Sequence, residues 1–167
     1  LRSMTDDVDE FAIRMPGTYL EKTCKSVSDA DLHLVSDEEK RAQERAEEEN
    51  KDMLAALKSA LSGKVKDVRL SDRLKSSPVC LTSDGPLSIE MEKVLASMPV
   101  SDGSVKAERV LEINPAHPVF GVLATLNTDD ARVAKYANLL YDQALLIEGL
   151  PIEDPVAFSN AICELMV

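Results

Sequence analysis

The C-terminal part of the chain carries more apolar surface than one packing partner can cover. Thr128, Asp129 and Asp130 are typical of a helix start, where the helix dipole favours acidic side chains, and they predict a helix that runs to about Glu148. In its second half, apolar residues spread almost all round this helix. The apolar positions are Val133, Ala137, Leu140, Ala144 and Ile147, flanked by Leu139, Tyr141, Leu145 and Leu146.

A second helix follows, with Asp154 as its N-cap and Pro155 as its first residue. A hairpin of two such helices can finish burying its apolar surface by pairing with a copy of itself, so we expect a homodimer. The alternative, that the rest of the chain covers both faces, stays open on sequence alone. The predicted interface residues are Ala137, Leu140, Tyr141, Ala144, Leu145, Ile147, Phe158, Ile162, Leu165 and Met166.

The middle of the chain predicts an α+β fold with a small three-stranded sheet. Runs rich in β-branched residues favour strands at 64–71, 78–82 and 108–113. A long helix is expected from the capping box at Ser36 to Gly63, and we interpret its charged first half as solvent-facing surface. A shorter helix is expected over 119–126. His117 precedes it, where an imidazole most often caps a helix or bonds a backbone carbonyl.

The first 35 residues have the character of a remnant of a preceding domain. A short amphipathic helix is predicted from Asp6 towards Tyr19, with Phe11 and Met15 on its apolar side, and Pro16 interrupts it. We therefore expect a remnant over residues 1–35 and a separate domain over residues 36–167. Because the chain does not begin with Met, we also expect it to be a piece of a longer protein.

Charge and composition exclude several classes of partner. Thirty acidic and nineteen basic residues give a net charge of −11, which repels a phosphate backbone, so nucleic acid is not an expected partner. No apolar run is long enough to span a bilayer, and the acidic start does not resemble a signal peptide. We expect no membrane partner and a cytoplasmic location.

The sequence shows no catalytic, metal or cofactor site. Cys24, Cys80 and Cys163 are far apart and have no histidine nearby to complete a metal-ligand set, so we interpret them as reduced structural thiols. The six glycines are isolated, and no phosphate-binding loop is present. We therefore expect this chain to have no enzymatic activity and no cofactor of its own.

The segment from Leu87 to Met98 predicts a short amphipathic helix between the second and third strands. Its polar side carries Ser88, Glu92 and Lys93. Its apolar side is a stripe of five residues: Leu87, Met91, Val94, Leu95 and Met98. A stripe of this kind is ordinarily core, but its two methionines also suit an exposed, adaptable binding surface, and both interpretations stay open.

Four blocks of sequence, in this order, resemble the C-terminal region of the 90-kilodalton heat-shock chaperone family, bacterial HtpG type. They are KVKDVRLSDRL at 64–74, SPVCL at 77–81, LEINPAHP at 111–118 and LLYDQALL at 139–146. The likeness extends over nearly the whole chain. The Phe11 helix and KSVS at 25–28 resemble the end of that family's middle domain.

The resemblance implies a homodimeric, ATP-dependent chaperone whose protomers join through a four-helix bundle, two helices from each. It also implies that the apolar stripe of the helix over 87–98 faces the cleft between protomers and contacts non-native client proteins. The ATP and magnesium site and the catalytic arginine would lie in regions outside this chain. The C-terminus shows neither an acidic Glu-Glu-Val-Asp motif nor an endoplasmic-reticulum retention signal, which favours the bacterial type.

Two other classes of function remain as alternatives. One is a free-standing acidic adaptor that docks a partner through the methionine-bearing helix. The other is a small hydrolase using His117, which is disfavoured because no nucleophile is placed near it in sequence.

Overall fold

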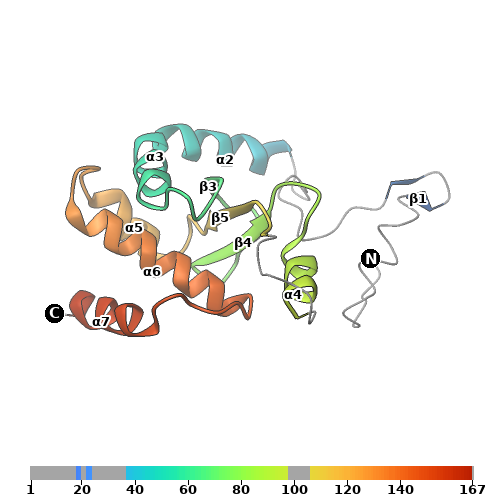
Figure 1. Ribbon diagram of the computed structural model, residues 1–167. Coiled ribbons are helices and arrows are strands. Elements are labelled where there is room, and N and C mark those ends of the chain that lie inside the picture. Colours follow the sequence, from blue (N-terminus) through green and yellow to red (C-terminus); the bar gives the residue numbers. More distant parts are fainter. Residues whose placement is uncertain (1–17, 20–21, 24–36, 98–105, 167) are drawn as a thin grey trace. The chain divides into compact units, whose positions relative to one another are not determined.

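The computed structural model describes residues 18–19, 22–23, 37–97 and 106–166 (Figure 1). The predicted helix over 6–17, most of the predicted remnant, the domain boundary after residue 35, and Met98 therefore lie outside the described residues. The chain divides into two compact units, one of residues 1–32 and 82–108 and one of residues 33–81 and 109–167. Each unit is described by itself.

The fold is α+β, as predicted. The helices of the described part are α2 (Asp37–Glu49), α3 (Lys51–Ala60), α4 (Ile89–Ser97), α5 (Pro118–Thr125), α6 (Ala131–Ile147) and α7 (Pro155–Leu165). The strands are β1 (Thr18–Tyr19), β2 (Lys22–Thr23), β3 (Asp67–Leu70), β4 (Val79–Ser83) and β5 (Arg109–Ile113). The three predicted strands are confirmed as β3, β4 and β5.

Strand β5 is the centre of the three-stranded sheet, whose order is β3-β5-β4. It pairs with β3 in parallel, with Val68 opposite Leu111 and Leu70 opposite Ile113. Four consecutive residues of β5, from Val110 to Ile113, are buried, as is typical of a strand covered on both faces. Strands β1 and β2 pair with each other in antiparallel orientation and form a second, two-stranded sheet.

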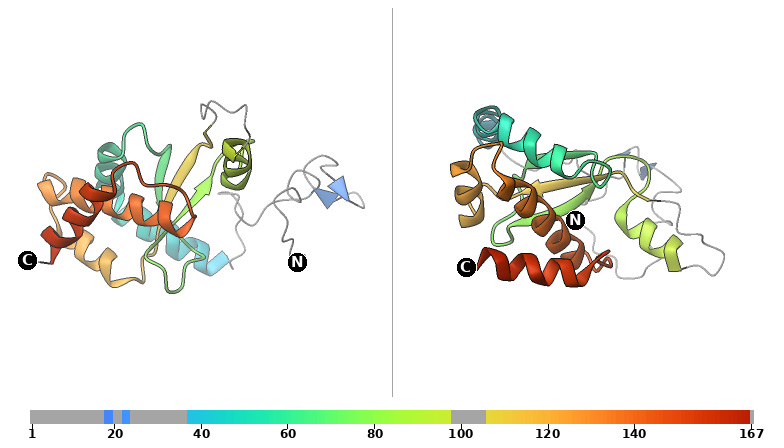
Figure 2. Two further views of the ribbon diagram at one scale, coloured as in Figure 1. Left: turned by 60° about the horizontal axis from the view of Figure 1, so that its bottom comes forward. Right: turned by 60° about the vertical axis from the view of Figure 1, so that its left-hand side comes forward.

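Helices α3, α6 and α7 form the helical side of the larger unit. Helix α3 packs against both α6 and β3, and Leu57 and Leu61 are almost fully buried there. Helices α6 and α7 lie side by side, as Figure 1 and both views of Figure 2 show. The predicted N-caps are confirmed, because Asp130 and Asp154 accept hydrogen bonds from the first backbone N–H groups of α6 and α7. His117 Nδ1 caps α5 by accepting from Val119 N at 3.2 Å.

The single long helix predicted from Ser36 to Gly63 is wrong in one respect, because it is interrupted at Asn50. The Asn50 backbone leaves the helical conformation, and its side chain donates to the carbonyl oxygen of Ala46 at 2.8 Å. The same carbonyl oxygen also accepts from the Asn50 backbone N–H at 3.1 Å, so the asparagine side chain adds a second, local hydrogen bond at this point of the backbone. The helical run is thereby divided into α2 and α3.

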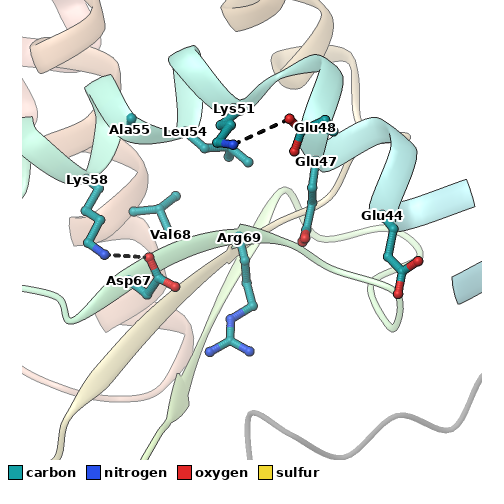
Figure 3. Close-up of a pocket in the computed structure, with 10 residues that line it drawn as sticks. All are labelled: Glu44, Glu47, Glu48, Lys51, Leu54, Ala55, Lys58, Asp67, Val68 and Arg69. Carbon is teal, nitrogen blue, oxygen red and sulfur yellow. Dashed lines mark hydrogen bonds and ion pairs between the residues drawn. The ribbon is translucent and has the colours of Figure 1, made fainter. Parts of the chain in front are cut away.

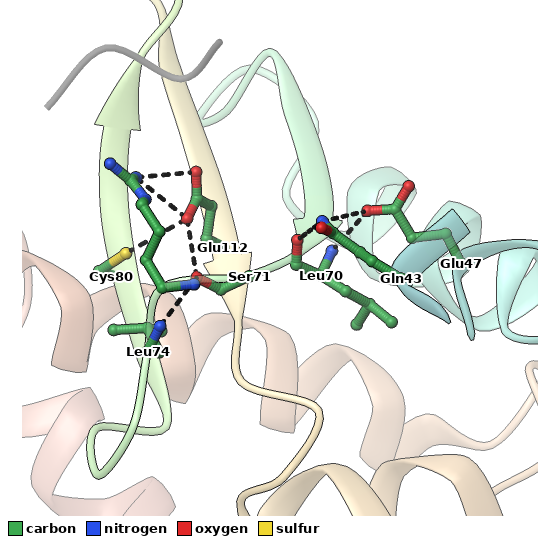
Figure 4. A network of polar contacts seen from close by, with 8 residues as sticks. Gln43, Glu47, Leu70, Ser71, Leu74, Cys80 and Glu112 are labelled. Carbon is green, nitrogen blue, oxygen red and sulfur yellow. Dashed lines mark hydrogen bonds and ion pairs between the residues drawn. The ribbon is translucent and has the colours of Figure 1, made fainter. Parts of the chain in front are cut away.

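The charged half of that helix is also more than solvent-facing surface. Gln43 Nε2 donates to the carbonyl oxygen of Leu70 at 2.7 Å, and Leu70 N donates to Glu47 Oε1 at 3.1 Å (Figure 4). Leu70 lies on β3, an edge strand with backbone groups that have no neighbouring strand on one side. These two side chains of α2 therefore satisfy the open edge that would otherwise invite pairing with another chain.

A buried carboxylate ties the loop after β3 to the central strand. Glu112 on β5 is buried, and Arg73 Nη2 donates to both of its oxygens at 3.1 Å. Ser71 Oγ donates to Glu112 Oε2 at 3.0 Å and accepts from the backbone N–H of Leu74 (Figure 4). Burial, and then the negative charge of Glu112, raise the pKa of the nearby Cys80 thiol to about 12. Cys80 is therefore protonated and poorly nucleophilic at neutral pH.

Arg73→Ala is expected to lower the free energy of unfolding by about 3 kcal/mol, because it removes a cation that is hydrogen-bonded to both oxygens of the buried Glu112 carboxylate. Urea denaturation measures the change. Lys58→Ala is the matched control, since Lys58 and Asp67 form an exposed ion pair at 2.9 Å and such pairs contribute about 0 to 1 kcal/mol. A loss for Arg73→Ala no larger than that of the control would contradict the role given to Glu112.

Candidate interaction surfaces

Helix α6 has three sides, and the described residues of the chain cover two of them. One side is buried in the core of the unit and carries Val133, Ala137, Leu140, Tyr141, Ala144 and Leu145. A second side faces α7 across a groove lined by Ala134, Lys135, Asn138, Leu139 and Asp142. The third side is apolar and is left open by the described residues: Tyr136 is half-buried, and Leu146 and Ile147 are 52% and 50% exposed. The half-buried Leu139 lies where this side meets the groove.

Helix α7 has no fully buried residue. Its half-buried side, with Phe158, Ala161 and Leu165, is the side of the helix that also lines the groove with α6. On another side, Lys135 Nζ on α6 donates to Glu164 Oε2 at 2.6 Å and ties the two helices together. The remaining side is apolar and exposed, with Val156, Ile162, Cys163 and Met166; Met166 is 80% exposed and Val156 69%.

We call the open sides of these two helices the α6–α7 apolar surface. It consists of Tyr136, Leu139, Leu146, Ile147, Val156, Ile162, Cys163 and Met166. Apolar residues that occur singly on a surface are normal, whereas a group on two adjacent helices is typical of a surface that another molecule covers.

The residues predicted for a dimer interface fall into three groups in the structure. Ile147, Ile162 and Met166 belong to the α6–α7 apolar surface, and Phe158 and Leu165 are half-buried beside it. The other five are buried inside the chain: Ala137, Leu140, Tyr141, Ala144 and Leu145. Sequence reasoning left out Leu146 and Val156, although Leu146 belongs to the apolar widening of α6 and Val156 lies two turns before Cys163 on α7.

The groove between α6 and α7 has a volume of about 340 Å³ and carries charges of both signs. Lys64 Nζ donates to Asn138 Oδ1 at 2.9 Å and lies 5.6 Å from the centre of the Tyr141 ring. Burial raises the pKa of the Asp142 carboxyl in this groove, while the positive charge of Lys64 opposes that shift. The groove therefore does not present the uniform charge that a strongly acidic or basic ligand requires.

A second groove, of about 590 Å³, lies between β3 and the helices α2 and α3 (Figure 3). Leu54, Ala55 and Val68 contribute its apolar lining. Its charged residues pair with one another across short distances: Lys58 with Asp67 at 2.9 Å, and Lys51 with Glu48 at 3.4 Å (Figure 3). Within the described residues, no group of three or more His, Cys, Asp or Glu side chains is arranged to hold a metal ion.

We call the apolar stripe predicted over 87–98 the α4 stripe: Leu87, Met91, Val94, Leu95 and Met98. Its described residues are neither core nor fully exposed. Leu87, Met91, Val94 and Leu95 are half-buried, and Met98 lies outside the described residues. The buried residues of this segment are instead Ser88, Ile89 and Glu92. Ser88 starts the helix, because its Oγ accepts from Met91 N at 3.1 Å.

The described glycines do not provide a cradle for a phosphate group. Gly63, Gly121 and Gly149 have no neighbouring atom within 4 Å of the place where a Cβ would stand, and at Gly85 the nearest atom is a carboxylate oxygen of Glu108 at 3.4 Å. None of the described helices is long and apolar enough to cross a membrane.

Comparison with known proteins gives the family of this chain. The family model described as "Hsp90 protein" matches residues 3–167. The chain is 55% identical over 164 residues to "Chaperone protein HtpG" of Bacillus subtilis, 57% identical over 164 residues to the protein of that name from Bacillus velezensis, and 56% identical over 163 residues to that from Clostridium acetobutylicum.

These alignments cover 97–98% of this chain and 26% of each relative. The chain thus spans about a quarter of the length of the relatives that it matches. It belongs to the Hsp90 family.

Proposed function

We propose that this chain is the C-terminal dimerisation and client-contact region of a molecular chaperone. Residues 36–167 form the dimerisation domain in this proposal, and residues 1–35 are the end of a preceding middle domain. Two helices from each protomer, α6 and α7, associate as a four-helix bundle. The observation that carries the proposal is the α6–α7 apolar surface, since the described part of one chain leaves it uncovered.

The hydrophobic effect is the driving force for this association. Each large apolar side chain that moves from water to an interior contributes about 1.5 to 3 kcal/mol. Leu146, Ile147, Val156, Ile162 and Met166 are all more than a third exposed. In a symmetric dimer each of them is buried twice, once in each protomer.

The bacterial relatives named as chaperones favour this function over a free-standing acidic adaptor. In the same proposal, ATP and magnesium bind and ATP is hydrolysed in parts of the parent protein outside this chain, which itself is not an enzyme. The partners are a second copy and non-native client proteins, not nucleic acid or a membrane. A cytoplasmic location belongs to the proposal and rests on those relatives.

The dimer is tested by the mass of the chain in solution at micromolar concentration. Light scattering is expected to give about twice 18.3 kDa, since a specific interface buries roughly 1,200 to 2,000 Å². Ile162→Glu is expected to reduce the mass to that of one chain, because it places an unpaired charge in the interface.

Val122→Glu is the matched control, because Val122 is 44% exposed but lies on α5, outside the α6–α7 apolar surface. It should leave the dimer intact. A single-chain mass for the unmodified protein, or equal effects of the two variants, would contradict the proposal. Leu140 is unsuitable for this test, since it is 2% exposed inside the chain and a charge there would unfold the domain.

The client-contact role is tested with Met91→Ser combined with Leu95→Ser in the full-length parent protein. Because both side chains are half-buried, the melting temperature is expected to fall by no more than about 4 °C. Suppression of aggregation of chemically unfolded citrate synthase should weaken clearly.

Ile89→Ser provides the comparison on the same helix, since Ile89 is buried and its loss should destabilise the protein by about 2 kcal/mol or more. If the double variant is as unstable as Ile89→Ser, the stripe is core. If it is stable and still protects the client fully, the stripe is not a client site.

We also propose that the 167-residue chain neither binds nor hydrolyses ATP, because its glycines are isolated in the sequence and form no phosphate-binding loop motif. Isothermal titration with magnesium and ATP is expected to give only the heat of dilution. Saturable binding would show that a nucleotide site lies within this chain and would overturn this part of the proposal.

A further inference from the structure

Helix α4 buries a side that its sequence makes partly polar. Ser88, Ile89 and Glu92 are buried, with Glu92 only 7% exposed, while the α4 stripe is half-buried. At 3.6 residues per turn, the centre of the buried side lies about 120° round the helix axis from the centre of the stripe. A helix oriented by apolar burial alone would turn its stripe inward. A second interaction therefore sets the rotation of α4.

The carboxylate of Glu92 supplies that interaction. Its Oε2 accepts a hydrogen bond from the backbone N–H of Ala107 at 2.9 Å, and Ala107 is itself buried. The same two chain segments are joined near the start of the helix, where Asp84 N donates to the carbonyl oxygen of Glu108 at 2.8 Å. The segment 106–108 is thus hydrogen-bonded to this part of the chain at two places: to the backbone of Asp84, before the helix begins, and to the Glu92 side chain in its first turn.

Rotating the stripe inward would separate Glu92 from Ala107. The Ala107 N–H would then lose its acceptor, and an unpaired polar group in the interior is unfavourable. The bond that would be lost is of the stronger kind, because its acceptor is a carboxylate. Inward rotation would gain apolar burial for residues such as Met91 and Leu95 at the expense of this bond.

We propose that Glu92 is a positioning residue: its bond to Ala107 fixes the rotation of α4 about its own axis and keeps the α4 stripe accessible. The consequence for client proteins rests on the proposed function above, whereas the rotation itself does not. The two are therefore tested separately.

The rotation is measured by the rate at which a maleimide labels Leu95→Cys in the 167-residue chain, with Cys24, Cys80 and Cys163 replaced by Ser. Glu92→Gln keeps an oxygen acceptor of the same reach, and it is expected to label within about twofold of the parent. Glu92→Leu removes the acceptor and makes the buried side apolar, so labelling is expected to slow about tenfold as the stripe turns inward. Equal labelling in folded Glu92→Leu would overturn the proposal.

A second measurement does not depend on the folding of any variant at Glu92. Hydrogen exchange of the Ala107 amide in the unmodified chain is expected to be strongly protected, and exchange at the rate of a solvent-exposed amide would overturn the proposal. In the full-length protein, slow labelling of Glu92→Leu together with weaker protection of unfolded citrate synthase supports both the rotation and the client role. Slow labelling with unchanged protection supports the rotation and contradicts the client role of the stripe.

Discussion

The width of the apolar surface on α6 is the constraint on which the rest of the larger unit depends. One side of this helix completes the core around β5 and α3, and a second side receives α7. Packing against the core explains why Leu140 and Ala144 are fully buried. On its second side, α6 contacts α7 through residues of α7 that are half-buried. In the proposed dimer, a second copy covers the third side, around Leu146 and Ile147, with the same residues in both protomers.

Polar contacts, not apolar burial, hold the elements beside this core in place. Glu112 fixes the loop after β3, and Gln43 and Glu47 satisfy the edge of β3 at Leu70. In the proposed role of Glu92, the same principle sets the rotation of α4. Polar contacts of this kind specify orientation because a rotated or shifted element would leave a donor or an acceptor without its partner.

The elements that depend on local sequence could be predicted. Strands β3, β4 and β5, the N-caps Asp130 and Asp154, and the capping role of His117 all depend on residues within a few positions of each other. The rotation of α6 could not be predicted in full, because Leu140 and Leu146 are equally apolar and only the position of α3 decides which is buried. The role of Glu47 could not be predicted either, since it depends on Leu70, 23 residues further along the chain.

The reactivity of Cys163 at increasing protein concentration tests the central claim most directly. Cys163 lies on the exposed apolar side of α7, while the pKa of about 12 makes Cys80 a poor competitor for an alkylating reagent; Cys24 is replaced by Ser. If α6 and α7 form the interface between two copies, alkylation of Cys163 slows as the concentration rises through the dimer dissociation constant. A rate that stays constant from the most dilute to the most concentrated sample, in a protein whose mass doubles over that range, would place the interface elsewhere.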